Sequence, residues 1–500
     1  MLHLMKFEDY YQSLVRIIRG FEEKRLTRPH ILVCAPSNGA VVNILHRVAN
    51  FGFIQRDGNK YWPSIIQVGA SSMNDSNSPA EFSVEKMADT LLRMSKEDWL
   101  LWFSRQYHTV KAIEQDLNLH LNLLQHNSDG EVRPCREATV SNILSMHENR
   151  DRAVADLSRL EHLRGYHNGA VVDDDSLAEL RSRIEASFVD EAEIVFTTLA
   201  SSGKKCLMGI SHGFQTLIVD EAAQATESCA LLPLRHGVKH CILVGDPQQL
   251  PSTILSKLAL NSCYDKSLFE RLVDNRVYPT LLSVQYRMHS SIRQFPSNFF
   301  YGGKLVDGET YDGRESAMDY SSMMYSDFVP FGPYLVFDTS AGTEKRNENG
   351  SVKNEFEASL CVRLLQVLEA SLHKHGISRQ TVALISPYTC QCARLQQLTQ
   401  HLQLFNVTLT ISTIDGFQGR ESDIVIFSCV RNSATGMGFM NDARRLNVAL
   451  TRAKKTMWIL CSANADKNQL WASLLRDARN RNVLVPQNAV HAFATQIRAI

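Results

Sequence analysis

Short runs of apolar, mostly β-branched residues recur along the chain, and polar residues directly follow each run. They occupy residues 31–37, 193–198, 216–222, 241–247, 334–338, 382–388, 423–429 and 457–462. Each run is too short for a buried helix, so the pattern predicts strands. Amphipathic stretches such as 357–373 and 386–402 separate several of them. This α/β pattern is typical of parallel sheets with helices on both faces.

The spacing of these runs predicts two similar α/β domains. Four runs lie before about residue 250 and four after about residue 330. Between the first two runs, residues 94–186 are rich in Leu, Glu, Gln, Arg and His at helical spacing. We therefore expect a first domain over 1–93 and 189–276, a helical insertion over 94–188, and a second domain over 277–500.

Length and composition narrow the class of protein. The 500 residues suffice for about three domains at ~150 residues each. Lys and Arg number 53, as do Asp and Glu. This balance argues against nucleic acid held mainly by a basic face, although not against a grip by backbone amides. Without a membrane-spanning run or signal peptide, we expect a soluble, intracellular protein with no membrane association, whose 11 scattered cysteines stay reduced.

Two carboxylates follow the run at 216–219. In open α/β sheets, ligands bind beyond the carboxyl ends of strands. Asp220 is placed to hold Mg²⁺, directly or through water, and Glu221 to orient and deprotonate an attacking water. Acid pairs at strand ends are also common loop starters, so this pair alone leaves a structural role open.

The next strand ends in Gly-Asp-Pro-Gln-Gln-Leu-Pro at residues 245–251. Glycine allows a tight turn, and the neutral amide of Gln249 can reach a phosphate and sense whether the terminal group is present. The alternative is a plain Asp-Pro turn with exposed glutamines. Two such motifs on consecutive strands make that alternative a poor explanation.

Three further segments carry candidate chemistry. In Gln-Tyr-Arg-Met-His at 285–289, tyrosine can stack on a base and arginine can neutralise charge on a transferred phosphoryl group. Gln-Gly-Arg-Glu at 418–421 precedes a strand, and 444–454 reads as a helix with the cationic residues Arg444, Arg445, Arg452 and Lys454. Taken singly, each also fits an ordinary surface helix or loop.

Together these segments resemble the motifs of a known family. APSN, DEAAQ, GDPQQLP, QYRMH, DGFQGRE and RLNVALTRAK are similar, in order and spacing, to motifs Ia, II, III, IV, V and VI of superfamily 1 helicases. The branch is the senataxin-like one, which also contains the nonsense-mediated-decay helicase. The match runs from about Pro29 to Ser462 and leaves out the helical insertion, which sits where this branch carries an accessory subdomain. The resemblance implies two RecA-like domains with ATP in the cleft between them.

The resemblance also implies roles for individual residues. Asp220 holds Mg²⁺, Glu221 activates water, Gln249 senses the γ-phosphate, and Asp246 belongs to the nucleotide-binding set.

From the second domain, Arg287 and Arg452 act as arginine fingers and Tyr286 stacks on the adenine. Glu421 holds the ribose hydroxyls, and Gly419 also belongs to the nucleotide-binding set.

Nucleic acid is expected to cross the top of both domains. Small hydroxyl and amide side chains at strand ends, together with backbone N–H groups, can grip phosphates without a basic excess and without reading sequence. The residues that the resemblance places there are Pro36, Ser37, Asn38, Thr197, Thr198, Pro387, Tyr388, Ser412 and Thr413.

The family's glycine-rich P-loop, which ends in Gly-Lys-Ser/Thr, does not occur in the 500 residues. Gly203-Lys204 is followed by Lys205, and Gly303-Lys304 by Leu305. Residues 1–28 resemble the helix and loop that follow a P-loop, so we expect the chain to begin just after it. A central strand of the first sheet and the branch's N-terminal accessory barrel are then absent too. Nothing replaces the amide nest and lysine that cradle the phosphates, so we expect little ATP hydrolysis.

These residues predict an ATP-dependent helicase or translocase on single-stranded RNA or DNA, in RNA processing or the resolution of RNA–DNA hybrids. The alternative is a catalytically silent nucleic-acid-binding or scaffold protein derived from a helicase. The resemblance also suggests a monomer that meets RNA-processing proteins, in the nucleus or cytoplasm with the nucleus favoured. A zinc site at His236 and His240 is a poor alternative, because that segment lacks a zincin glutamate and contains a glycine.

Overall fold

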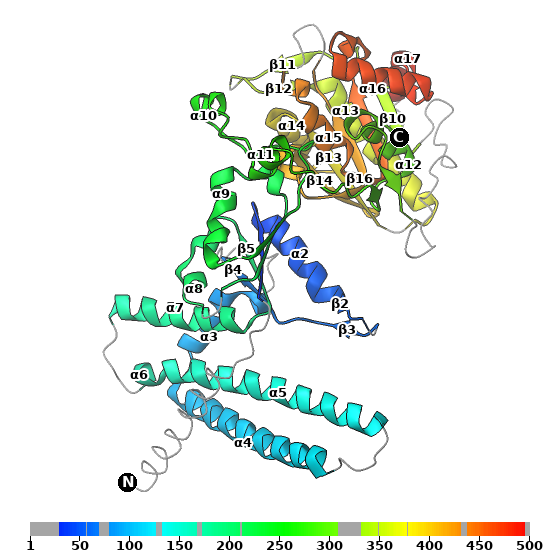
Figure 1. Cartoon of the computed structure of the whole chain (residues 1–500). Helices are drawn as coiled ribbons and strands as arrows, with labels where there is room; N and C mark the ends of the chain where they lie inside the picture. Colours follow the sequence, from blue (N-terminus) through cyan, green and yellow to red (C-terminus); the bar gives the residue numbers. More distant parts are fainter. Residues whose placement is uncertain are drawn as a thin grey trace. The chain divides into compact units, whose positions relative to one another are not determined.

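The computed structural model describes residues 30–56, 58–69, 80–126, 133–167, 173–210, 213–308, 332–348, 350–377, 379–431 and 438–495. The chain divides into two compact units (Figure 1). Unit 1 comprises Met1–Gly245 and Ser252–Arg271, and unit 2 comprises Asp246–Pro251 and Leu272–Ile500. The domain bounds expected from the sequence stay a prediction. In the described ranges, no helix is both long and apolar enough to cross a membrane.

Unit 1 is built on a five-stranded parallel sheet with the strand order β4-β5-β1-β6-β7. The strands are β1 (Ile31–Ala35), β4 (Ile65–Val68), β5 (Ile194–Thr198), β6 (Thr216–Val219) and β7 (His240–Leu243). Side chains alternate between the faces. Leu32 and Cys34 join one apolar cluster and Val33 and Ala35 the other, so both faces are covered.

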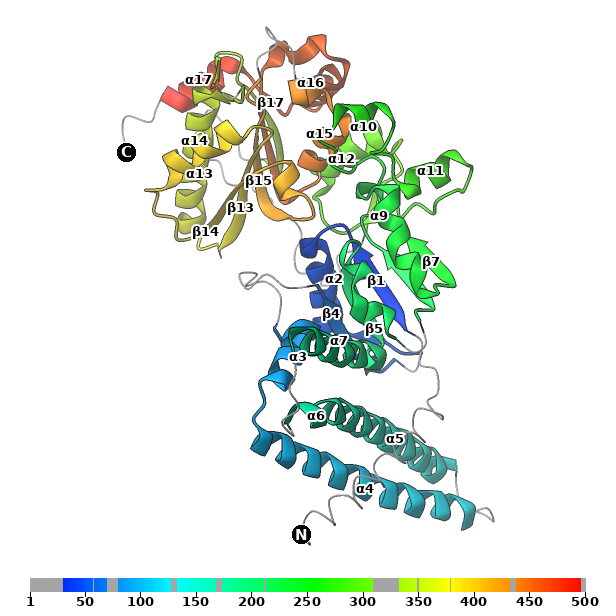
Figure 2. The same cartoon turned by 90° about the vertical axis from the view of Figure 1, so that its left-hand side faces the viewer.

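Helices cover the two faces of this sheet. Helix α2 (Asn38–Phe51) packs on one face through Val41 and Leu45. The other face is covered by α3 (Val84–Leu92), α7 (Asp174–Glu191) and α8 (Lys205–Met208) (Figures 1 and 2).

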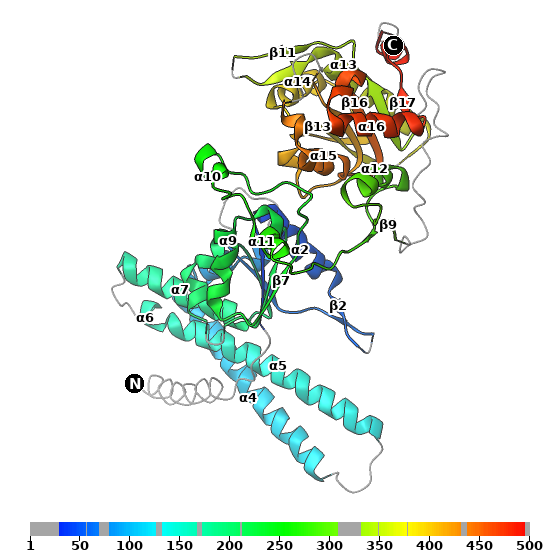
Figure 3. The ribbon, with the colours of Figure 1, turned by 45° about the horizontal axis from the view of Figure 1, so that its top comes forward.

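A helical insertion separates β4 from β5 in the chain. Helices α4 (Lys96–His126) and α5 (Arg133–His162) lie side by side as an antiparallel pair (Figures 1 and 3), followed by α6 (Arg164–His167). The insertion has its own apolar cluster, in which the buried Trp99 donates its indole N–H to the Leu160 carbonyl at 2.8 Å.

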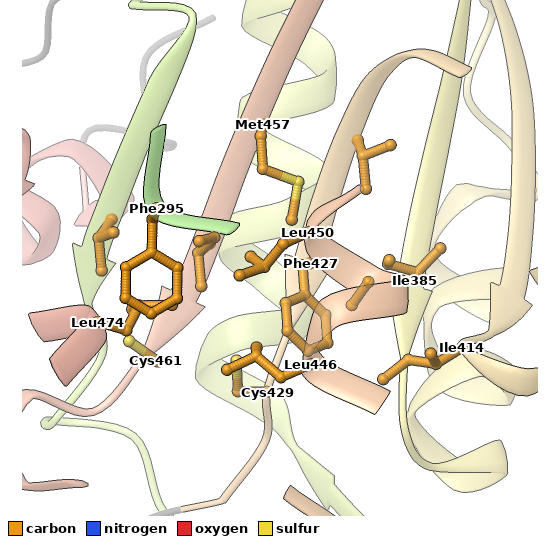
Figure 4. Close-up of a cluster of buried hydrophobic side chains, with 14 of the residues drawn as sticks. Phe295, Ile385, Ile414, Phe427, Cys429, Leu446, Leu450, Met457, Cys461 and Leu474 are labelled. Atoms are coloured by element: carbon orange, nitrogen blue, oxygen red, sulfur yellow. The ribbon is translucent and has the colours of Figure 1, made fainter. Parts of the chain in front are cut away.

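Unit 2 contains a six-stranded parallel sheet with the order β14-β13-β15-β16-β10-β17. The strands are β10 (Tyr334–Asp338), β13 (Gln380–Ser386), β14 (Val407–Thr413), β15 (Ser422–Ser428), β16 (Ala453–Cys461) and β17 (Leu484–Val485). On one face, α12 (Ser290–Phe300), α15 (Ala443–Leu450) and α16 (Gln469–Asn480) pack on residues such as Ile385, Phe427 and Met457 (Figure 4). On the other lie α13 (Glu355–Lys374), α14 (Thr389–Thr399) and α17 (Gln487–Thr495).

Smaller elements complete the described structure. They are the antiparallel pairs β2 (Phe53–Ile54) with β3 (Lys60–Tyr61) and β11 (Glu344–Arg346) with β12 (Val352–Asn354), the parallel pair β8 (Val284–Gln285) with β9 (Val306–Asp307), and the helices α9 (Glu227–Leu231), α10 (Lys257–Asn261) and α11 (Leu268–Asp274).

The eight predicted strands and the parallel α/β fold are confirmed. The helix expected over 444–454 is too long: α15 ends at Leu450, because the apolar run at 457–462 extends back to Ala453 as part of β16. The helix expected over 386–402 begins three residues later, since Ser386 still belongs to β13. Strand β14 was not predicted, because Thr and Ser interrupt its apolar pattern.

Candidate nucleotide and nucleic-acid sites

The predicted catalytic carboxylates lie at the carboxyl edge of the sheet of unit 1. Since β1, β6 and β7 are parallel and in register, their carboxyl ends meet at this edge. The Asp220 N–H donates to the Cys34 carbonyl at 2.8 Å, and the Ala222 N–H donates to the Val244 carbonyl at 2.8 Å. The backbone that carries Asp220 and Glu221 is therefore fixed from both neighbouring strands.

Glu221 has an unusual backbone conformation. Its φ is 53°, in the left-handed region. Non-glycine residues there cost about 1–3 kcal/mol and occur most often at functional sites. The Gln224 side-chain amide donates to the Glu221 carboxylate, so the orientation of this carboxylate is set locally.

The residues at this edge fit a hard divalent cation. Burial raises the pKa of Asp220, and the backbone hydrogen bond from Glu221 only partly offsets it. A desolvated carboxylate gains most from a nearby positive charge, and Mg²⁺ usually binds one or two carboxylates together with water and phosphate oxygens. Within the described ranges, no group of three or more His, Cys, Asp or Glu side chains could hold a metal by itself.

Gly245, which begins the next motif, is required by a close approach. A Cβ atom at this position would lie 2.8 Å from the Ala223 backbone nitrogen. The glycine therefore lets the end of β7 pack against the loop that carries the carboxylates.

Strand β7 forms an open edge of the sheet beside these carboxylates. In the described structure it pairs with β6 alone. Ile242 and Val244 are each 39% exposed, although strands of parallel sheets are normally buried on both faces. The apolar surface of β7 is therefore uncovered where a further parallel strand could add.

The loop Asp246–Pro251 belongs to unit 2 by its contacts. The Asp246 carboxylate accepts hydrogen bonds from the Gln248 N–H at 2.9 Å, the Gln249 side-chain amide at 2.9 Å and the Tyr301 hydroxyl at 2.6 Å. Burial raises the pKa of the Tyr301 phenol, and the charge of Asp246 adds to this effect. Tyr301 therefore remains a hydrogen-bond donor to this loop at neutral pH.

Helix α15 and the residues that follow it hold the same loop. The Asn447 side-chain amide donates to the Gln248 carbonyl at 2.9 Å and to the Tyr301 oxygen at 2.7 Å. Arg452 is buried, and its guanidinium donates to the Gln249 side-chain oxygen at 3.3 Å. The structure thus brings the predicted sensor and one predicted arginine finger together, and it adds Tyr301 and Asn447, which carry no predicted role.

The second predicted finger pairs with the predicted ribose-binding residue. Arg287 donates to the Glu421 carboxylate at 2.8 Å and to the Thr451 carbonyl at 3.2 Å. Lys454 forms an ion pair with Glu421 at 2.9 Å. Although burial acts in the opposite direction, the bonds from Lys454 and Arg287 lower the pKa of Glu421. Glu421 is therefore ionised at neutral pH.

Two other members of the predicted nucleotide set lie at the surface. Tyr286 is 76% exposed, which suits an aromatic ring awaiting a stacking partner. Gly419 has a φ of 72° in the turn before Glu421, a conformation that favours glycine.

On unit 1, the predicted nucleic-acid residues divide into exposed and buried ones. Ser37 caps α2, with Ser37 and Asn38 exposed and Pro36 partly exposed. The predicted contact of the Thr197 side chain is wrong: this residue is fully buried and its hydroxyl donates to the Val68 carbonyl at 2.9 Å. Its neighbour Thr198 is partly exposed.

On unit 2, Ser412 and Thr413 at the end of β14 are partly exposed, as is Pro387. Thr413 accepts a hydrogen bond from the Gly416 N–H at 3.1 Å, which shapes the turn that follows. Tyr388 is only 7% exposed and packs with Val352 and Val430. The prediction that Tyr388 contacts nucleic acid is therefore corrected: the ring is part of the protein interior.

His236 has a structural environment. It is 7% exposed, and its Nε2 lies 2.7 Å from the Ser202 carbonyl oxygen. Its ring meets Phe214 edge to face. These contacts account for His236 without a metal.

Comparisons with known proteins identify the family to which the chain belongs. A family model described as an AAA domain matches residues 7–257, and a second model with the same description matches 264–464. A probable helicase of Dictyostelium discoideum is 34% identical over 464 residues, which are 92% of this chain and 40% of that protein. Helicase SEN1 of Saccharomyces cerevisiae is 31% identical over 472 residues, 92% of this chain and 20% of that protein.

Regulator of nonsense transcripts 1 of D. discoideum is 36% identical over 314 residues, which are 61% of this chain and 23% of that protein. The chain spans less than half the length of these three relatives. The two models together cover most of its residues. The chain therefore belongs to the AAA-domain family, in the senataxin-like branch of superfamily 1 helicases that includes the regulators of nonsense transcripts.

Proposed function

We propose that this chain is the motor region of an ATP-dependent helicase or translocase that acts on single-stranded RNA or DNA. The observation that carries the proposal is the pair Asp220 and Glu221, fixed between β1 and β7 with Glu221 in a left-handed conformation. The named helicases among its relatives support the same reading. By analogy with them, the process is RNA processing or the resolution of RNA–DNA hybrids, in the nucleus or cytoplasm and with RNA-processing proteins as partners.

In this proposal Asp220 would hold Mg²⁺, which would supply charge neutralisation at the phosphates of ATP. Glu221 orients the attacking water and takes its proton. Gln249 senses the terminal phosphate, and Arg287 and Arg452 offset the charge that develops on the transferred group.

Unit 2 holds several of these groups in protein–protein hydrogen bonds. Gln249 bonds to Arg452, and Arg287 bonds to Glu421. A triphosphate and its ribose must therefore exchange these bonds for their own. Because only the difference between the two sets contributes to affinity, this exchange would link nucleotide binding to a rearrangement of the loop Asp246–Pro251.

We further propose that the phosphate-binding strand of this family pairs with β7. The uncovered apolar residues Ile242 and Val244 lie on this edge, next to the carboxylates. A strand added there, followed by Gly-x-x-x-x-Gly-Lys-Ser/Thr, would place its backbone amides and lysine beside Asp220. The 500 residues do not contain that motif.

The test compares the 500-residue chain with a version that carries such a strand and loop before Met1. ATP hydrolysis and unwinding are measured on RNA, DNA and RNA–DNA hybrids. We expect nucleic-acid-stimulated hydrolysis from the longer version and little from the 500 residues. Robust nucleic-acid-stimulated hydrolysis by the 500-residue chain would contradict the proposal that the phosphate-binding loop is required.

The alternative is a catalytically silent nucleic-acid-binding or scaffold protein derived from a helicase. A longer version that binds nucleic acid but never hydrolyses ATP would support this alternative. An in-frame coding sequence for the motif upstream of Met1 would argue against it.

A further inference from the structure

Unit 2 contains a buried carboxyl group for which the proposed motor chemistry has no use. Glu357, in the first turn of α13, is 1% exposed. One carboxylate oxygen accepts a hydrogen bond from the Thr339 hydroxyl at 2.9 Å. The other accepts from the Ser428 hydroxyl at 2.6 Å and from the Val430 N–H at 2.8 Å. Three hydrogen bonds thus tie the ends of β10 and β15 to the start of α13.

Val430 is strained, and α13 holds it in place. Its φ is 69°, a region that is unfavourable for a β-branched residue and costs about 1–3 kcal/mol. Its N–H donates to Glu357, and its carbonyl accepts from the Asn354 side chain at 3.3 Å. Both backbone polar groups of Val430 are therefore fixed by side chains at the start of one helix, from its N-cap Asn354 and from Glu357 in its first turn.

The same network reaches the loop Pro387–Tyr388. Gln391, fully buried in the first turn of α14, donates to the Ser428 oxygen at 3.0 Å and accepts from the Asn354 N–H at 2.9 Å. Ser428 passes the chain of hydrogen bonds on to Glu357. Tyr388 packs against the Val430 side chain. The loops after β13 and β15 thus depend on each other through this network.

We propose that Glu357 is a positioning residue for single-stranded nucleic acid. It fixes Pro387 and Tyr388 after β13, and Cys429 and Val430 after β15, in the conformation that presents Pro387 and the exposed Thr389 to the phosphates. Glu357 does not touch the nucleic acid. The inference rests on the proposed function of the chain, and it assigns to the buried Glu357 carboxyl an indirect role in the binding of nucleic acid.

A purely structural role would leave a different signature. Burial raises the pKa of Glu357 from 4.5 to about 7, so its ionised form is a cost to the folded state at pH 8. Glu357→Leu removes this cost but leaves the Val430 N–H and the Ser428 and Thr339 hydroxyls without their acceptor, which lowers the stability of the fold. If Glu357 positions the loops, protein that is still folded at the assay temperature binds nucleic acid more weakly, whereas a purely structural role leaves the affinity of the folded protein unchanged.

The experiment measures thermal unfolding and the binding of fluorescent single-stranded RNA and DNA by the full chain at pH 8. We expect Glu357→Leu to unfold below the wild-type temperature, to remain folded at the assay temperature, and to bind about fivefold more weakly there, which corresponds to about 1 kcal/mol. Glu357→Gln should bind within about twofold of wild type, because its amide oxygen still accepts from Val430 and Ser428.

Glu355→Leu is the matched control. Glu355 lies in the same first turn of α13, where it is partly exposed and forms ion pairs with Lys353 and Arg394. Its replacement removes the same charge without touching the network, so affinity should not fall. Removal of a negative charge alone favours a polyanion, and a loss confined to Glu357→Leu therefore reports positioning.

Ser428→Ala provides a second route if Glu357→Leu does not fold. It interrupts the hydrogen-bond chain from Gln391 to Glu357 and should lower affinity about threefold, a change of less than 1 kcal/mol. If folded Glu357→Leu or Ser428→Ala protein binds nucleic acid with wild-type affinity, this inference is wrong, but the proposed function is not affected. A wild-type chain that binds neither RNA nor DNA would overturn the proposed function, and this inference with it.

Discussion

The carboxyl edge of the sheet of unit 1 and the amino edge of the sheet of unit 2, where Arg452 and Glu421 precede β16 and β15, differ in how far they are covered and hydrogen-bonded. In unit 1, the carboxylates of Asp220 and Glu221 lie beside the uncovered strand β7. In unit 2, Gln249, Arg452 and Arg287 have protein partners. The edge that would carry out the chemistry is thus open on one side, whereas the edge that would sense and position is pre-organised by its own hydrogen bonds. This difference predicts that mutations at the two edges fail in different ways.

The largest effect is expected at the open edge. In the version with the added strand and loop, Glu221→Gln should lower the rate of ATP hydrolysis by about 10²–10⁴-fold, because the amide cannot accept the proton of the attacking water. The affinity for ATP should change little, since the side chain keeps its size. Measurements of steady-state ATP hydrolysis and of equilibrium ATP binding separate the effect on the rate from the effect on the affinity. Equal loss of both would mean that Glu221 is not the general base.

The second prediction concerns pH and the buried carboxyl group of unit 2. Burial raises the pKa of Glu357 from its ordinary value of 4.5 to about 7 in the folded state. Between these values the folded state binds more protons, so the free energy of unfolding should fall as pH rises from 4.5 to 7. The shift corresponds to a contribution on the order of 3 kcal/mol.

Unfolding of wild type and Glu357→Gln between pH 4.5 and 8 tests this. The substitution should have little effect on relative stability at the acid end and should stabilise the chain at pH 8. A difference between the two proteins that does not vary with pH would show that Glu357 does not titrate in this range.

The third prediction returns to unit 1. Gly245→Ala places a Cβ 2.8 Å from the Ala223 nitrogen, so β7 must move away from the carboxylate loop. We expect a loss of about 1–3 kcal/mol in the free energy of unfolding. Gly39→Ala is the control, because nothing lies within 4 Å of that position in α2 and alanine favours helix. If both substitutions had the same effect, the close approach at Gly245 would not matter.

The sequence predicts those parts of the fold and the site that depend on residues close together in the chain. Strands buried on both faces, such as Leu32 to Ala35, read as continuous apolar runs and were found. The edge strand β14 carries Thr and Ser on its partly exposed surface and was missed. Asp220 was found as a candidate because it directly follows a strand in the chain.

The remaining site residues depend on contacts that no local pattern encodes. Tyr301 meets Asp246 across 55 positions, and Ser428 meets Glu357 across 71. The division between Thr197 and Thr198 could have been inferred, because neighbouring side chains on a strand point to opposite faces. The burial of Tyr388 could not, since it depends on the conformation of Val430 on another strand end.

The smallest expected effect tests whether the pre-organised edge depends on one hydroxyl. Tyr301→Phe removes the donor to Asp246 and the acceptor for Asn447, whose side-chain oxygen is already buried without a hydrogen-bond partner in the described structure. The loss should be about 1–2 kcal/mol in the free energy of unfolding. Tyr278→Phe, at a position 86% exposed, should cost nothing measurable.

The more informative readout is hydrogen exchange of the loop Asp246–Pro251. If Tyr301 holds this loop, its amides should exchange faster in Tyr301→Phe while the amides of β13 and β15 keep their protection. Uniformly faster exchange throughout unit 2 would instead mean that the phenol stabilises the whole unit. In that case the edge of unit 2 would owe its order to the apolar core beneath it, and the contrast with unit 1 would be one of packing rather than of hydrogen bonding.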